Sequence, residues 1–154
     1  MMEEVNEKRI YELAYEFKHR YPTTIAWRLQ KNSDIVEKFL NPGEKVQYVF
    51  VAQKSESVFN ILSSCVVALT DQRIMIGRKR VVFGYFFTSI TPDMFNDLKV
   101  HSSIVWGRVK IDTIKEEVIL TNIAKSAMPE VKTAISTYII EQKKKYPKST
   151  KKAF

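Results

Sequence analysis

At Gly43 the spacing of the apolar side chains changes from the period of a helix to the period of a strand, and near Asn122 it changes back. Between these points short apolar runs are separated by turn residues, which is typical of antiparallel strands. A helix is predicted over 122–146, with Ser126 as its N-cap and Pro129 in its first turn, where a missing N–H costs nothing. We predict seven strands, over residues 45–52, 64–69, 73–78, 82–90, 97–101, 105–111 and 117–121.

Seven short strands followed by one amphipathic helix favour a mainly β fold, α+β overall. The expected architecture is a seven-stranded antiparallel, partly open barrel whose gap is capped by the C-terminal helix. A chain of 154 residues can bury a core of this kind without a metal or a disulfide. The predicted core consists of Cys65, Val67, Leu69, Ile74, Ile76, Leu98, Val100, Val109, Ile111, Val118 and Leu120, with Ile135 and Tyr138 facing them.

Two amphipathic helical segments, separated by Pro22, precede the strands, and the apolar stripe of the second begins at Ile25. The first strand is apolar on both faces, with Val49 and Val51 pointing opposite to their neighbours. One face must therefore contact something besides the barrel core, and we expect the helices to cover it. The predicted division is an N-terminal helical extension packed on the barrel over 1–40, the barrel domain over 41–142 and a lysine-rich tail over 143–154.

The positive charge is concentrated at the C-terminus. The formal net charge is +8, of which residues 141–154 contribute +5, so only +3 remains for the rest. Nucleic-acid binding needs a basic stripe or aromatic stacking platforms on the folded body, and we do not expect it. The N-terminus is charged throughout, and no apolar run approaches the roughly 20 residues that span a bilayer, so the expected location is the cytoplasm.

Several motifs resemble those of one family. They are the Pro42-Gly43-Glu44 segment before the first strand, the string VALTDQRIMIGRKR from Val67, the Trp106-Gly107 strand and the segment NIAKSAMPEVKTAI from Asn122. Together these motifs resemble a bacterial pleckstrin-homology (PH) domain of the YokE-like kind, over about residues 41–142. The resemblance implies a PH-like barrel that serves as a binding scaffold, and its motifs specify the fold rather than an activity.

The family resemblance also bears on the ligand. Eukaryotic PH domains often hold inositol phosphates with several cations around the first hairpin. The matching segment here, 53–57, has the single cation Lys54 and the opposing Glu56. Inositol phosphate binding at this place is therefore not expected.

Basic residues mark the predicted third hairpin. Arg78, Lys79 and Arg80, with Arg73 nearby, could hold phosphates through bidentate hydrogen bonds. The alternative is a solvated hairpin whose charges prevent pairing of sheet edges. Both interpretations stay open.

A second candidate surface is the sixth strand. There Trp106, Arg108 and Lys110 share one face, while Val105 and its alternate neighbours take the core face. An outward stripe of this composition suits an anion or a partner protein. Trp106 could equally pack beneath the N-terminal helices.

Catalysis is not expected. His19 falls on a predicted helix and His101 on a strand, and neither has a second His or Cys at metal-ligand spacing. Cys65 is the only cysteine, so no intramolecular disulfide can form, and it lies in an apolar run that is typical of a buried strand, so redox chemistry is not expected. No cofactor or metal site is predicted.

These observations lead to two functional hypotheses. The first is a non-catalytic module that recognises a protein or peptide through an exposed sheet edge or the open end of the barrel. The alternative is a peripheral binder of anionic lipid or membrane surfaces, which uses Arg78, Lys79, Arg80 and the terminal lysines. A disordered solubilising tail explains those lysines as well. Self-association into a homo-oligomer is left open.

Overall fold

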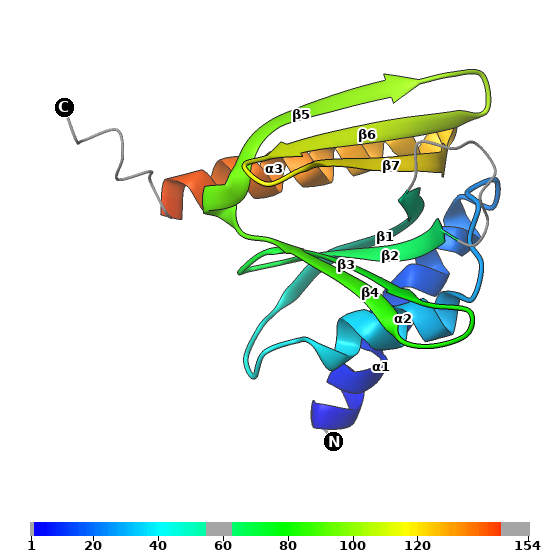
Figure 1. The fold of residues 1–154 in the computed structure, drawn as a ribbon, viewed down its shortest axis with the longest axis vertical. Helices are drawn as coiled ribbons and strands as arrows, with labels where there is room; N and C mark the ends of the chain where they lie inside the picture. The colour runs from blue at the N-terminus through cyan, green and yellow to red at the C-terminus, as the bar shows by residue number, and fades with distance from the viewer. Residues whose placement is uncertain (1, 55–62, 146–154) are drawn as a thin grey trace.

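The computed structural model describes residues 2–54 and 63–145, with side chains from Ile10 onward. Two helices, seven strands and a final helix follow one another in the predicted order (Figure 1). The elements are α1 (Met2–Arg20), α2 (Leu29–Lys38), β1 (Val46–Lys54), β2 (Ser64–Thr70), β3 (Ile74–Lys79), β4 (Tyr85–Ile90), β5 (Phe95–Ser102), β6 (Trp106–Thr113), β7 (Glu117–Ala124) and α3 (Met128–Lys145), with short 3-10 turns η2 (Pro92–Met94) and η3 (Lys125–Ala127).

The strands form one antiparallel sheet in the order β4-β3-β2-β1-β7-β6-β5. β1 pairs with β7 only where Gln53 and Lys54 lie opposite Thr121 and Leu120. Beyond this short junction the sheet splits into a four-stranded half and a three-stranded half, which Figure 1 shows as two layers. The predicted partly open barrel is confirmed.

The two faces of the four-stranded half meet different helices. Val51, Val66 and Gly77 form one cross-strand row. A Cβ atom at Gly77 would lie 2.7 Å from Cγ2 of Val36, so α2 packs directly on this row. The structure thus places α2 on the Val51 face, whereas the ring of Phe17 in α1 lies 6.3 Å from that of Phe50, whose side chain points to the other face of β1.

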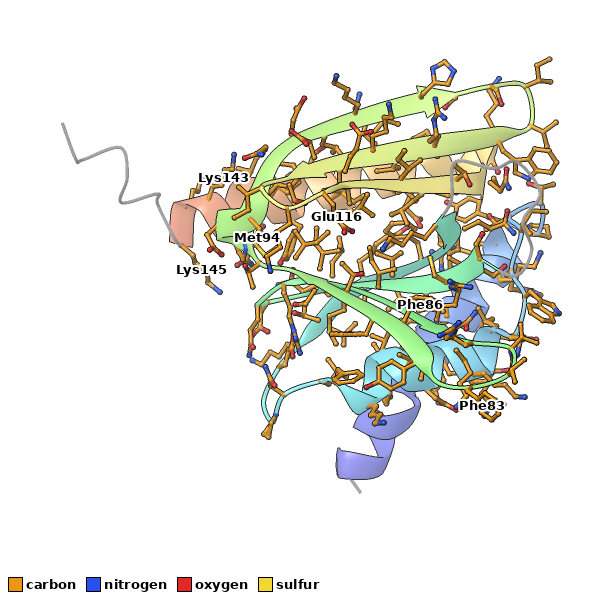
Figure 2. All side chains as sticks on the ribbon, in the orientation of Figure 1. Phe83, Phe86, Met94, Glu116, Lys143 and Lys145 are labelled. Atoms are coloured by element: carbon orange, nitrogen blue, oxygen red, sulfur yellow. The ribbon has the colours of Figure 1, made fainter. Side chains whose placement is uncertain are left out.

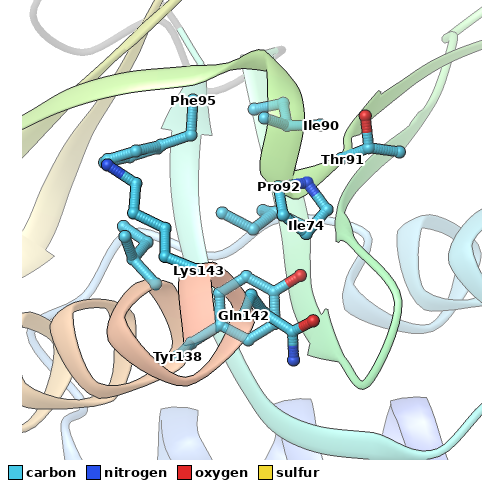
Figure 3. Close-up of a pocket in the computed structure, with 9 residues that line it drawn as sticks. Ile74, Ile90, Thr91, Pro92, Phe95, Tyr138, Gln142 and Lys143 are labelled. Atoms are coloured by element: carbon cyan, nitrogen blue, oxygen red, sulfur yellow. The ribbon is translucent and has the colours of Figure 1, made fainter. Parts of the chain in front are cut away.

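The opposite face looks toward α3. Ile74 and Ile90 line a recess together with Tyr138 of that helix (Figure 3). Every predicted core residue belongs to a single apolar cluster, in which Leu98 and Val100 are half-buried and the others are buried. Ile135 has no exposed surface, as predicted for a helix that plugs the gap.

Several predicted boundaries are wrong at the ends of elements. β7 continues through Ala124, because Asn122 adopts a left-handed conformation (φ 56°) and the resulting bulge lets Ala124 pair with Trp106. Ser126 lies in η3, and α3 begins at Met128, so Ser126 is not its N-cap. Ile25 lies before α2 and donates its N–H to the carbonyl oxygen of Asn122.

Two strands, β4 and β6, begin later in the chain than predicted. β4 begins at Tyr85 rather than Val82, because the Arg80 N–H donates to the Gly84 carbonyl and closes a turn over 80–84. Gly84 has a φ of +74°, which a side chain would strain. Val105 precedes β6 and is 43 % exposed, so it is not a core residue. Of the predicted tail, Lys143 to Lys145 form the last turn of α3, and 146–154 lie outside the described residues.

Candidate functional site

The β3–β4 hairpin projects an apolar turn from the end of the four-stranded half. The β3–β4 pairing ends at Lys79 and Tyr85, and the chain between them has no neighbouring strand. Val81, Val82 and Phe83 are consequently 52, 75 and 82 % exposed. We call these three residues the hairpin tip. Most large apolar side chains in a folded protein are better covered, so a contiguous exposed run of three indicates an interaction site.

Cations surround the base of the hairpin tip. The guanidinium carbon of Arg78 lies 4.4 Å from the ring centroid of Phe86, and that of Arg80 lies 5.0 Å from it. Burial lowers the pKa of Arg78 from its ordinary value, and the charge of Arg80 acts in the same direction. A guanidinium still remains charged at neutral pH. Two positively charged guanidinium groups therefore lie against the Phe86 ring beside the apolar tip.

The start of α2 holds the hairpin in place. The Arg28 guanidinium donates to the carbonyl oxygen of Arg80 at 3.2 Å, and the Lys79 N–H donates to Oδ1 of Asn32 at 2.8 Å. The amide of Asn32 donates in turn to the carbonyls of Trp27 and Ser64. Because Asn32 is almost completely buried, these bonds fix the base of the hairpin to the body of the domain.

The charges around the hairpin are of one sign. Between Asp71 and Asp93 the chain has cations but no acidic residue. Phe83 and Phe86 lie at the opposite end of the molecule from Lys143 and Lys145, which belong to the last turn of α3 (Figure 2). The hairpin cations and these lysines therefore do not share one surface.

Arg73 is separated from the other three hairpin cations by the length of β3. Its Nε donates to Oε2 of Glu44 at 3.1 Å, and its terminal nitrogen donates to Oε1 of the same carboxylate at 3.1 Å. Thr70 donates to Oε2 at 2.6 Å, and the Asn41 N–H donates to Oε1 at 2.9 Å. The side chain of Glu44 has no exposed surface. Arg73 is therefore part of a buried structural ion pair, and the sequence prediction that groups it with the hairpin surface is wrong.

The pairing of Glu44 with Arg73 joins two of the sequence motifs, Pro42-Gly43-Glu44 and the string that begins at Val67. Burial alone would raise the pKa of Glu44, but the hydrogen bonds and the charge supplied by Arg73 outweigh it and hold the pKa below its ordinary value. Asp71 adds a second link, since its carboxylate accepts from the Lys45 N–H and its own N–H donates to the Lys45 carbonyl. The two motifs join the start of β1 to the β2–β3 turn.

The side chain of Trp106 makes a contact within the chain. Its indole N–H donates to the carbonyl oxygen of Thr23 at 2.8 Å, so it contacts the segment between α1 and α2. Arg108 and Lys110 share its face of β6, where Lys110 lies 3.7 Å from the carboxylate of Glu117. The structure supports the intramolecular alternative for Trp106 and does not bring this stripe together with the hairpin tip.

The histidines and the cysteine form no catalytic or metal-binding group among the described residues. His19 stacks on Tyr15, His101 is exposed on β5, and burial raises the pKa of the Cys65 thiol to about 12. No group of three or more His, Cys, Asp or Glu side chains among the described residues could hold a metal ion. No helix in the described ranges is long and apolar enough to cross a membrane.

A shallow recess lies between α3 and the β4–β5 corner (Figure 3). Its volume of about 10 Å³ is far below the range of ordinary small-molecule sites. It is lined by Ile74, Ile90, Thr91, Pro92, Phe95, Tyr138, Ile139, Gln142 and Lys143. Its lining is mainly the barrel core, so we assign it to the packing of α3.

Sequence reasoning missed the hairpin tip. It assigned Val82 to a strand, because Val81, Val82 and Phe83 have the composition of a buried strand. The signal that could have identified the tip is its position between three consecutive cations and Gly84. A glycine after a short apolar run favours a turn rather than a continuing strand.

A family model and a solved structure are similar to this chain. No curated protein matches the chain significantly. The crystal structure of a pleckstrin homology domain from Shewanella amazonensis SB2B is similar, with 15 % sequence identity, a TM-score of 0.44, and coverage of 75 % of this chain and 88 % of that chain. The family model described as "Bacterial PH domain" matches residues 40–137. That match spans more than half of the sequence, and the chain belongs to the bacterial PH domain family.

Proposed function

We propose that this PH domain docks onto anionic lipid surfaces by inserting the hairpin tip at the interface. The observation that carries the proposal is the exposed run Val81 to Phe83, with Arg78 and Arg80 at its base. An apolar projection gains free energy by entering the acyl boundary, while cations around it gain about 1 kcal/mol each near anionic headgroups. The hairpin therefore brings the apolar and the electrostatic contributions to membrane binding together at one projecting turn.

The shape of the hairpin favours a membrane over a folded protein partner. Specific protein interfaces bury broad complementary patches, whereas the hairpin tip is a narrow turn of three apolar side chains. A lipid surface adapts to such a projection without a matching pocket. The absence of acidic residues between Asp71 and Asp93 removes repulsion from anionic headgroups.

Sedimentation with lipid vesicles tests the proposal. Neutral phosphatidylcholine vesicles are compared with vesicles containing phosphatidylserine, at low and at physiological salt. We expect binding to the anionic vesicles that weakens as salt rises, because screening reduces the surface attraction. Failure of the native chain to bind them at low salt contradicts the proposal.

Matched variants locate the contact. Phe83→Ser should reduce vesicle binding, and Arg80→Gln should reduce it about fivefold, the factor that corresponds to 1 kcal/mol. Ile114→Ser and Lys115→Gln are the controls, since both residues are exposed and lie in the β6–β7 turn beside Met94, at the opposite end from Phe83 (Figure 2). Equal losses in the controls would contradict a specific role for the hairpin.

A second candidate function is recognition of an extended peptide at a sheet edge. β5 is a terminal strand of the sheet, so its eight residues pair with β6 on one side only. A peptide could add a strand there through backbone hydrogen bonds. Ser102 is exposed and lies opposite Gly107 in a non-hydrogen-bonded pair, so its N–H is on the open side of β5. Substituting Pro for Ser102 should weaken such a complex without changing vesicle binding, and pull-down of partners with the native chain and this variant compares the two.

A further inference from the structure

The β5–β6 turn presents a second exposed apolar point. Ile104 is 89 % exposed, more than any other large apolar side chain among the described residues. The turn is held firmly, because the N–H and the hydroxyl of Ser103 both donate to the Trp106 carbonyl at 2.9 Å. The Lys125 N–H donates to the Val105 carbonyl at 2.9 Å. The exposure of Ile104 is thus a feature of an ordered turn.

This turn lies at the same end of the molecule as the hairpin tip. Figure 1 shows the β3–β4 and β5–β6 turns on the same side of the view. The segment between α1 and α2 joins them: the Thr23 carbonyl accepts from the Trp106 indole, and Arg28 donates to the Arg80 carbonyl. The segment between α1 and α2 therefore contacts residues beside both turns.

The segments at both turns match the hairpin in charge, and the carboxylate of Glu130 in α3 pairs with Arg20 at the end of α1. No acidic residue occurs from Phe17 to Ser33 or from Leu98 to Ile111, which are the joining segment with its flanks and the β5–β6 hairpin. A half-buried tryptophan stands beside each projection, Trp27 next to Arg28 and Trp106 two residues after Ile104. Tryptophan, with an apolar ring and one N–H, is enriched where protein meets the headgroup region of a membrane.

We propose that Ile104 is a second lipid contact. The domain then contacts an anionic membrane through two apolar projections, the hairpin tip and the β5–β6 turn. This inference rests on the proposed function of the hairpin. Two separated projections, with no acidic residue in the segment that joins them, fit the anionic interface. They also fix the orientation of the domain, with the junction of α1 and α2 facing the bilayer and the β4–β5 corner facing away.

The two tryptophans allow each point to be followed separately. In Trp27→Phe the remaining probe is Trp106, beside Ile104; in Trp106→Phe it is Trp27, beside the base of the hairpin. Each variant is mixed with phosphatidylserine-containing vesicles whose acyl chains carry bromine, which quenches nearby indoles. We expect both probes to be quenched, and circular dichroism checks that each variant retains the native fold.

Ile104→Ser supplies the decisive comparison, with Ile114→Ser as its control. Ile104→Ser should lower vesicle affinity at least about fivefold and remove the quenching of Trp106, because the serine side chain gains nothing in the acyl boundary. Ile114→Ser should do neither. If Ile104→Ser binds like the native chain, and Trp27 alone is quenched, the second contact is refuted while hairpin docking stands.

Two other results would overturn the inference in different ways. If the native chain does not bind the vesicles at all, the proposed function and this inference fail together. If size-exclusion chromatography shows a dimer that Ile104→Ser and Phe83→Ser both dissociate, and neither variant changes vesicle binding, the two points form an interface between copies of the chain.

Discussion

Replacing Arg73 with Met would leave the carboxylate of Glu44 buried without its cation. The side chain of Glu44 has no exposed surface, and that of Arg73 is only 15 % exposed. Arg73 supplies two of the hydrogen bonds that this carboxylate accepts and also donates to the Phe39 carbonyl. Removing one partner of a buried ion pair costs about 3–5 kcal/mol, a large part of the roughly 5–15 kcal/mol that stabilises a domain.

Urea denaturation followed by circular dichroism measures this loss. For a chain of this size, 3–5 kcal/mol corresponds to a fall in melting temperature of roughly 6–20 °C. The matched variant Arg73→Met with Glu44→Gln should recover part of the loss, because a neutral amide is far less costly to bury than an unpaired carboxylate. A loss below about 1 kcal/mol, or a loss that Glu44→Gln leaves unchanged, would refute the reasoning.

The pH dependence should differ in sign between the two proteins. In the native chain the pKa of Glu44 is lowered, so its stabilisation is present above the unfolded pKa of about 4.3 and is lost as pH falls through the folded value. In Arg73→Met burial remains without the cation, which should raise the pKa of Glu44. The deficit of the variant relative to the native chain should therefore shrink as pH falls through that raised pKa. A deficit independent of pH between 7 and 4 would contradict this account.

The other predictions concern packing and the two ends of the chain. Ile135→Ala should cost about 2–5 kcal/mol in urea denaturation, because a completely buried side chain is truncated, and a cost near zero would contradict its role as a plug. Gly77→Ala should cost about 1–3 kcal/mol, because the new methyl group meets Val36 at 2.7 Å; an unchanged denaturation midpoint would contradict this contact. Deleting residues 1–30 removes α1 and should expose the β1 side chains that Phe17 contacts, Tyr48 and Phe50, and light scattering should detect aggregation; a truncated chain as stable as the native one would contradict that cover. Deleting Lys148–Phe154 should leave the melting temperature almost unchanged, because a lysine-rich end has little to pack, and a fall of many degrees would show that the end docks.

The sequence predicted the strands and the core because both depend on local spacing. Alternation with a period of two and turn residues such as Asp71 locate the seven strands, and a spacing of 3.6 places Ile135 and Tyr138 on one face of the last helix. Strand ends were less predictable, because the partner strand sets them. β7 reaches Ala124 only because Asn122 adopts a left-handed conformation and Trp106 is available for pairing.

The candidate site depended on distant contacts. Arg73 and Arg80 look alike in the sequence, yet Arg73 bonds to Glu44, which lies 29 residues earlier, and Arg80 lies at the far end of β3. Nothing local in the chain distinguishes a cation engaged with a buried carboxylate from one at a surface. The direction of β3 and the position of the segment that leads into β1 decide which of the two arginines meets Glu44.

Hairpin exposure has the same physical origin. The run Val81 to Phe83 resembles the buried strand residues in composition, and the sequence alone determined only that it is apolar and lies between cations and a glycine. The pairing of β3 with β4 ends at Lys79 and Tyr85, so the tertiary structure decided that this run projects beyond the sheet. Burial depends on which neighbours a side chain has, and those neighbours are brought together only when the sheet closes against its helices.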